Sequence, residues 1–214
     1  MHIEYAKGTA IERKLWKDEK MGAIKRKASR LGFSFGMTIA THQSSVLNNA
    51  FSTTDTALGT GRATTGGDAV ALCSTAHKFN STSSATDIFS NTGTSALSYT
   101  SVFDTIVAGQ DLDGDRGNPM PSIFDVLYIP TALQKTAFEI VNAISKPGGA
   151  DNDANALRFV NARPLQVVVD PYLTNTKDWF MIDSLMAPMH LLWFWRERPF
   201  IYLNGSADQE LVAD

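Results

Sequence analysis

A long helix is the first element that the hydrophobic pattern predicts. From about Leu15 to Phe51, apolar positions recur every three or four residues, which is the spacing of one helix face. The residues on this face are Met21, Ile24, Ala28, Leu31, Phe35, Ile39, His42, Val46 and Ala50. No proline interrupts the segment, although Gly32 and Gly36 each cost about 1 kcal/mol relative to alanine. We therefore expect a helix of about thirty residues, about 45 Å long, that spans the subunit.

The chain changes character after this helix. Residues 52–96 consist mainly of Ser, Thr, Gly, Ala and Asn, with a short apolar run from Val70 to Cys73. Such a composition favours loops and turns over a packed core. We expect neighbouring elements to order this stretch, and we expect it to act through contacts.

A second helix is predicted to begin at Ser98. This serine is a suitable N-cap, and Leu97 and Val102 can form a hydrophobic staple around it. The turn-rich residues 111–119 then end the helix.

The rest of the pattern indicates strands with a helix between them. The predicted strands and helix, in chain order, are residues 124–129 (strand), 131–146 (helix), 165–170 (strand) and 179–183 (strand). A strand, helix, strand order is typical of an α/β unit, which we place at about residues 120–200.

Composition and cysteine usage exclude several classes of protein. The 214 residues are 43% hydrophobic and 19% charged, which is ordinary for a globular chain with a buried core. No run approaches the roughly 20 apolar residues of a membrane span, and the basic start lacks the apolar core of a secretory signal. Cys73 is the only cysteine, which excludes an internal disulfide and a thiolate-rich metal site. We expect no membrane partner and a cytosol-like compartment.

The net charge of -3 conceals a basic beginning. Basic residues outnumber acidic ones in the first thirty positions, where the basic residues are Lys7, Arg13, Lys14, Lys17, Lys20, Lys25, Arg26, Lys27 and Arg30. Basic residues interleaved with acidic ones can form a solvated helix face, or they can contact phosphate or an acidic protein surface.

A short acidic run has the beginning of a calcium loop. Asp111, Asp113 and Asp115 lie at the first, third and fifth positions of such a loop. The sixth position is Arg116 where glycine is needed, and the twelfth is Ser122 where a bidentate Glu is needed. The run is therefore interpreted as an acidic surface turn.

Two pairs of residues could be drawn as a nucleophile with its base. They are Cys73 with His77 and Ser44 with His42, and neither has a third orienting group in a recognisable local pattern. A lone cysteine in an apolar run is usually a small buried side chain. The glycine-rich segments fit no phosphate loop, and the histidines lack ligand spacing, so we expect no cofactor and no metal.

The densest apolar feature lies near the end of the chain. Its members are Trp179, Phe180, Trp193, Phe194 and Trp195, with Met181, Met186 and Met189 close by. These residues form either the core or a surface that packs against a second copy, because Trp, Phe, Met and Arg are enriched at interface centres. Arg196 and Arg198 flank the group.

An ordered series of segments also carries a family resemblance. The segments are Val46–Phe51, Ala71–His77, Leu97–Ser98, Asp115–Gly117, Val126–Pro130 and Val167–Leu173, followed by Trp179. In this order they resemble the major head protein of Mu-like tailed phages, a branch of the Hong Kong 97-type capsid fold, over about residues 10–200.

The resemblance implies an α+β fold of the Hong Kong 97 type. It implies a peripheral domain with a spine helix at residues 15–118 and an axial α/β domain at residues 119–200. Residues 1–14 correspond to a remnant of an extended hairpin loop, and residues 201–214 return toward the peripheral domain. Relatives usually carry further segments at both ends, so we expect this chain to be truncated at both ends.

The resemblance also implies a structural protein and no enzyme. Copies would form hexamers and pentamers in a virion capsid, assembled in the bacterial host cytoplasm around double-stranded DNA, with scaffold, portal or decoration proteins as further partners. The expected inter-subunit contacts are Trp179, Trp193, Trp195, Arg196, Arg198, Asp111, Asp113, Asp115, Arg116, Lys14 and Arg26. The alternatives are a small hydrolase that uses Cys73 or Ser44 with a histidine, and a phage tail or decoration protein.

Overall fold

The structure is a computed structural model of the 214-residue chain. It describes residues 4–10, 12, 14, 17–18, 22–79, 88–114, 116–148, 153–159 and 163–200. The predictions made for Asp115 and for residues 201–214 therefore lie outside the described residues, as does part of the predicted hairpin remnant at residues 1–14.

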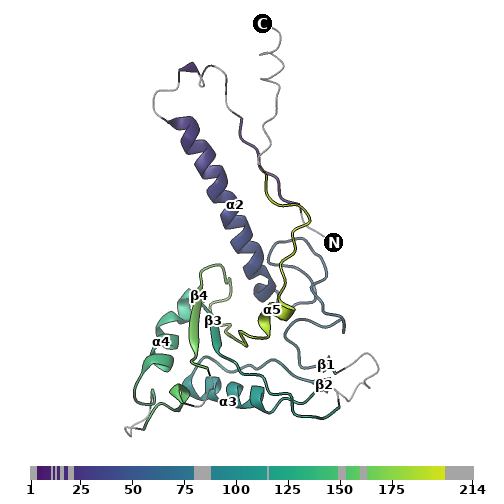
Figure 1. The fold of residues 1–214 in the computed structure, drawn as a ribbon, viewed down its shortest axis with the longest axis vertical. Helices are drawn as coiled ribbons and strands as arrows, with labels where there is room; N and C mark the ends of the chain where they lie inside the picture. The colour runs from purple at the N-terminus through teal and green to yellow at the C-terminus, as the bar shows by residue number, and fades with distance from the viewer. Residues whose placement is uncertain are drawn as a thin grey trace.

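The long helix is present as α2, from Ala23 to Asn48, and it projects away from the rest of the molecule (Figure 1). Its predicted start near Leu15 is wrong. Gly22 adopts a left-handed conformation with a φ of 66°, which interrupts helical hydrogen bonding and sets the first turn at Ala23. The 26 residues give a length of about 39 Å.

Among the described residues, α2 docks against the sheet through its C-terminal end. Its buried residues are Ser44 and Ser45, both near that end. Phe33, farther up the helix, is 73% exposed, and Val46 on the predicted apolar face is 46% exposed. The periodic pattern therefore predicts the helix correctly, but in the described part of the chain most of its apolar residues are only half-buried and none is fully buried.

The loop-rich stretch is confirmed. A cluster of hydrogen bonds around Asn49 and Asp55, here called the polar hub, orders its first part. Its described regular structure is a short antiparallel pair, β1 (His77–Lys78) with β2 (Ile88–Phe89). Asn49 is 4% exposed and donates from its side-chain amide to Asp55 over 2.8 Å. Its amide oxygen accepts from the backbone of Thr56 and Ala57. These bonds hold the loop against the end of α2.

The polar hub also favours the ionised form of Asp55. Its carboxylate accepts hydrogen bonds from the backbone of Leu58 and from the side chains of Thr60 and Asn49. These donors, led by Leu58, lower the pKa of Asp55 to about 2, against the opposing effect of burial.

Helix α3 (Tyr99–Gln110) begins where the sequence predicts. Ser98 and Ser101 form a reciprocal capping box, in which each side chain accepts from the other residue's backbone. Val102 and Ile106 on its inner face are almost fully buried in the main core.

The α/β prediction is confirmed by a three-stranded sheet of order β4-β3-β5. Strands β3 (Val126–Pro130) and β4 (Gln166–Asp170) are parallel, and β5 (Phe180–Ile182) is antiparallel to β3. A 3-10 turn, η1 (Thr131–Leu133), leads into α4 (Gln134–Asn142), which packs on β3 and β4. The predicted helix thus ends before Lys146, because Ala143 is extended.

The main core lies between this sheet, α3 and α4. Leu127 and Ile129 of β3 are fully buried, and Ala137 and Ile140 of α4 pack against them. A second 3-10 turn, η2 (Ala156–Arg158), adds Leu157 to the same cluster.

The chain then leaves the sheet through a short helix, α5 (Ala187–His190), and runs back beside α2 (Figure 1). The described N-terminal residues 4–10 lie near the same side of α2, because Tyr5 and Lys7 bond to side chains of that helix. Among the described residues, no helix combines the length and apolarity needed to cross a membrane.

Candidate functional site

A buried carboxylate joins α2 to the sheet. Asp170, at the end of β4, accepts a hydrogen bond of 2.5 Å from Ser44 of α2 and one of 2.6 Å from Tyr128 of β3. The backbone amide of Tyr172 donates to its other oxygen over 2.8 Å. Burial and the bond to Asp170 raise the pKa of Tyr128, so its hydroxyl stays a donor at neutral pH.

The next turn of α2 adds a second tie to the same strand end. The side-chain amide of Asn48 donates to the carbonyl of Tyr172 over 3.0 Å, and its oxygen accepts from the backbone of Thr174 over 2.9 Å. The direction of the projecting helix is therefore fixed at its C-terminal end.

An aromatic junction brings both ends of the described chain onto α2. The Tyr5 hydroxyl lies 2.7 Å from Nδ1 of His42, and the two rings meet edge to face. On its other side His42 meets Trp193 at a ring-centroid distance of 5.1 Å, and Trp193 meets Trp195 at 5.3 Å. Burial lowers the pKa of His42, which favours its neutral form.

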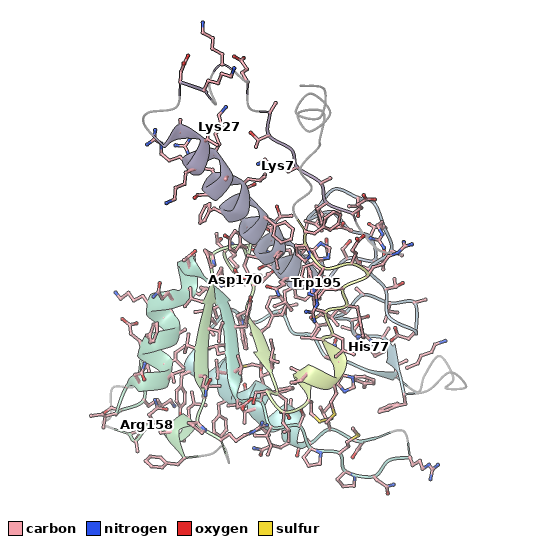
Figure 2. The ribbon with its side chains drawn as sticks, turned by 45° about the horizontal axis from the view of Figure 1, so that its top comes forward. Lys7, Lys27, His77, Arg158, Asp170 and Trp195 are labelled. Atoms are coloured by element: carbon pink, nitrogen blue, oxygen red, sulfur yellow. The ribbon has the colours of Figure 1, made fainter. Side chains whose placement is uncertain are left out.

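Residues 191–200, here called the aromatic segment, are exposed along their whole described length. Phe194 is 71% exposed and Phe200 is 68% exposed, although Trp193 and Trp195 are anchored at the junction. Figure 2 shows Trp195 beside the C-terminal end of α2, to the right of Asp170. Five consecutive exposed apolar side chains, from Leu191 to Trp195, are typical of a protein–protein contact.

Two members of the apolar group, the predicted contact Trp179 and its neighbour Phe180, separate from the rest. Trp179 packs against the main core and donates its indole N–H to the carbonyl of Ser95 over 3.0 Å. Phe180 is 8% exposed in a smaller core cluster. The apolar group seen in the sequence is thus divided into a core half and an exposed half.

The predicted charged contacts that the structure describes lie on the surface. Asp111 caps the end of α3, and Asp113 and Arg116 occupy the turn that follows it. Arg196 and Arg198 lie within the aromatic segment. Arg26 lies in the first turn of α2, which is far from α3 in Figure 1, and both Lys14 and Arg26 are exposed. The structure does not bring these charges together within one subunit.

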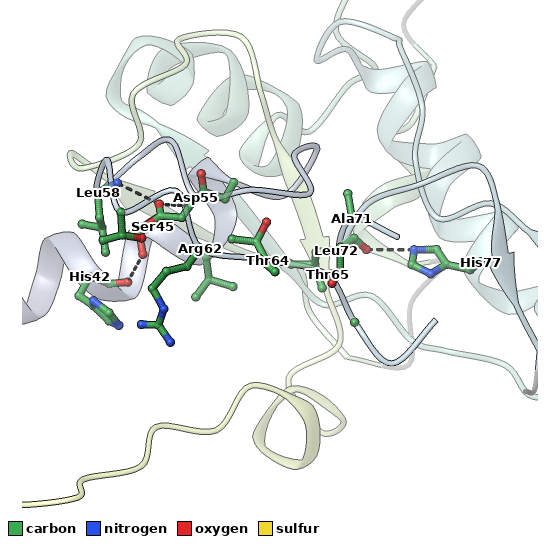
Figure 3. Close-up of a pocket in the computed structure, with 15 residues that line it drawn as sticks. His42, Ser45, Asp55, Leu58, Arg62, Thr64, Thr65, Ala71, Leu72 and His77 are labelled. Carbon is green, nitrogen blue, oxygen red and sulfur yellow. Dashed lines mark hydrogen bonds between the residues drawn. The ribbon is translucent and has the colours of Figure 1, made fainter. Parts of the chain in front are cut away.

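A pocket of about 380 Å³ opens beside the end of α2 (Figure 3). His42, Arg62 and His77 are among its lining residues, together with apolar Leu58 and Leu72. Neither Cys73 nor Ser44 is among the described residues that line it.

Neither of the two candidate nucleophile–base pairs forms. Nδ1 of His77 lies 2.6 Å from Asp68 and its Nε2 lies 3.2 Å from the carbonyl of Leu72, so both nitrogens are occupied away from Cys73. Burial raises the pKa of the Cys73 thiol to about 11, which leaves little thiolate at neutral pH. Ser44 bonds to Asp170, and His42 bonds to Tyr5.

Sequence reasoning missed one charged cluster. Arg163 bridges two buried carboxylates, at 2.6 Å to Asp183 and 3.2 Å to Asp125. Burial opposes ionisation of Asp183, but the bonds from Arg163 and from backbone amides lower its pKa to about 2. Ser184 also donates to Asp125 from its backbone and its hydroxyl. No spacing rule marks these residues, because they lie 20 to 60 positions apart.

A family model described as "Phage capsid protein" matches residues 3–208 of the chain. No curated protein and no solved structure matches it.

Proposed function

The chain belongs to this phage capsid protein family, and we propose that its copies assemble into the icosahedral head shell of a tailed phage or prophage around double-stranded DNA. Proteins of such a family are structural components of the virion. Neighbouring copies would meet through the aromatic segment and through charged surfaces, and the shell would enclose the DNA.

The aromatic segment is the observation that carries the proposal. Within the described residues, exposed large apolar side chains outnumber buried ones, and the densest run of them is Leu191 to Trp195. An isolated subunit would hold this surface in water at a free-energy cost of about 25 cal/mol per Å². A second copy that covers it would recover that energy, as interface cores rich in Trp and Phe do.

The charged surfaces complete the proposed contacts. Helix α3, which ends at Asp111, and the first turn of α2, which contains Arg26, lie at opposite ends of the subunit in Figure 1, an arrangement that suits head-to-tail ion pairs between neighbours. Head-to-tail contacts close into rings when the rotation between copies allows it. Many modest contacts of this kind give a persistent shell, because the contacts are multivalent.

Within the family we propose the Hong Kong 97-type fold of the Mu-like phages. The resembling segments fall on elements that a capsid subunit of this type needs. Val46–Phe51 covers the end of α2, Val126–Pro130 is β3, and Val167–Leu173 covers most of β4 and the turn after it. In this proposal α2 is the spine of a peripheral domain at residues 15–118, and the sheet belongs to an axial domain at residues 119–200.

The hydrolase alternative predicts a pocket around Cys73 or Ser44 with a histidine. Ser44 and His77 are hydrogen-bonded to other groups, and Cys73 packs against the smaller core cluster, which favours the structural function. The tail or decoration alternative accounts for the Ser/Thr-rich loop but requires neither α2 nor the sheet.

Negative-stain electron microscopy and light scattering of the purified chain, at several protein concentrations, test the proposal. We expect rings or shells whose yield rises with concentration. A monomer at every concentration would overturn the assembly proposal, and hydrolysis of ester substrates by that monomer would favour the enzyme.

A further inference from the structure

The projecting half of α2 concentrates positive charge. Its 26 residues include no Asp or Glu, and Lys25, Arg26, Lys27 and Arg30 lie within its first eight positions. All four side chains are exposed. Among the described residues, none of the four forms an ion pair.

This placement is unfavourable for the helix itself. The N-terminal end of a helix carries a partial positive charge of about +0.5, and acidic residues stabilise it there. The first turn of α2 contains no acidic residue. The helix end and its four cations therefore add their fields, and together they attract an anion.

Three cations converge on one small pocket at this end. Lys27 and Arg30 lie three residues apart on the same face of α2, and Lys7 approaches from the N-terminal segment. The three line a pocket of about 190 Å³, together with Gly8, Thr9 and Leu31. A bond of 2.7 Å from Nζ of Lys7 to the hydroxyl of Ser34 fixes the N-terminal segment against the helix. Figure 2 shows Lys7 and Lys27 near the distal end of α2, remote from Asp170 and Arg158.

We propose that Lys7, Lys27 and Arg30 bind a phosphate of the double-stranded DNA backbone. The inference rests on the proposed function, because a shell around DNA brings duplex to one face of every subunit, and it assigns that face. The guanidinium of Arg30 can donate two hydrogen bonds to one phosphate, and the two ammonium groups supply charge without reading base sequence.

Lys7, Lys27 and Arg30 could also meet the acidic turn of a second copy, the partner proposed above for Arg26, but the observations favour DNA for these three. That turn carries Arg116 beside Asp111 and Asp113, so its own cation would face the cations of α2. The cations also continue along α2 from Lys25 to Arg30, over about 8 Å. A nucleic acid strand offers a phosphate at every nucleotide over such a distance.

The test uses the full chain with Lys7, Lys27 and Arg30 all changed to Gln. Its control is the full chain with three other exposed cations, Lys135, Arg158 and Lys177, changed to Gln, which removes the same charge from distant surfaces. Binding of a short fluorescein-labelled duplex is followed by anisotropy between roughly 50 and 200 mM salt. A labelled peptide spanning residues 109–119 is measured in parallel, and circular dichroism checks that each variant is folded.

We expect duplex affinity to fall about eightfold for each phosphate that the variant no longer neutralises at about 0.1 M salt, and the salt slope to fall by about 0.9 per phosphate. The control should keep most of its affinity and slope. Equal reductions in the two variants would overturn the site, as would binding of the peptide without binding of the duplex. Electron microscopy of the wild-type chain scores shell formation separately, so a failure of assembly is distinguished from a failure of DNA binding.

Discussion

Ser44, near the end of α2, donates a hydrogen bond of 2.5 Å to the carboxylate of Asp170, which lies 126 positions later at the end of β4. The hydroxyl of Tyr128 donates to the same oxygen from the neighbouring strand. One buried carboxylate therefore connects the projecting helix to the sheet.

Replacing Asp170 with Asn should destabilise the subunit. An amide has a single acceptor oxygen, so either the two hydroxyls or the backbone amide of Tyr172 would be left without an acceptor. We expect the free energy of unfolding to fall by about 1–3 kcal/mol, measured by urea denaturation. Asp104→Asn, at an exposed position of α3, is the control and should change little. Equal stability of the two variants would show that the carboxylate does not hold α2.

His42 should make the aromatic junction sensitive to pH. Burial is the main cause of its lowered pKa, with the charge of Arg62 acting in the same direction and that of Asp55 against it. Because the folded pKa lies below the unfolded value of about 6.5, the stabilisation is complete above about pH 6.5 and is lost as the pH falls through the folded pKa. Protonation would place a charge between Tyr5 and Trp193.

The measurement is the urea midpoint of wild type and of His42→Asn as a function of pH. We expect the wild type to lose stability between about pH 7 and 5, and the variant to lose less over that range. Parallel curves would contradict a role for His42 in this pH dependence.

Arg163→Gln should raise the pH at which the subunit begins to unfold in acid. The pKa of Asp183 is about 2 in the folded chain, so its contribution is complete above the ordinary carboxylate pKa of about 4 and is lost as the pH falls toward 2. Without the guanidinium, Asp183 and Asp125 face each other's charge while they remain buried.

We expect Arg163→Gln to unfold at a lower urea concentration at neutral pH and to begin acid unfolding at a higher pH. Arg163→Lys keeps the charge but cannot bond to both carboxylates with the same geometry. Its stability to urea and acid should therefore lie between those of the wild type and of Arg163→Gln. A glutamine variant with the wild-type acid transition would exclude this ion cluster as its cause.

Phe194→Ser should impair assembly without unfolding the subunit. The side chain is 71% exposed, so its removal costs the isolated fold little, whereas a covering copy would be deprived of an aromatic side chain at its interface. Phe159→Ser is the matched control, because Phe159 is 79% exposed near η2, outside the aromatic segment.

Light scattering against protein concentration compares these two variants with the wild type. We expect the Phe194 variant to need a higher concentration to assemble and the Phe159 variant to follow the wild type. Trp193→Ala and Asp113→Ala extend the test to the junction and to the acidic turn. If all variants assemble like the wild type, the aromatic segment does not contribute to the contacts between copies.

Signals that act over a few residues determined much of the fold from the sequence alone. The cap at Ser98, the periodic positions of α2 and the strand-helix-strand order of residues 126–170 depend on neighbours within one or two turns. The start of α2 does not follow from such signals, because the left-handed conformation of Gly22 is a choice that a glycine permits but does not require.

The tertiary structure decided which of these residues are buried and which remain available to partners. Trp179 and Trp193 are the same residue type only fourteen positions apart, yet one packs on the core and the other lies on the surface against His42. The partners of Asp170 and Arg163 come from distant parts of the chain. Burial and ion pairing are set by such long-range contacts, whereas a local pattern specifies only which face of an element is apolar.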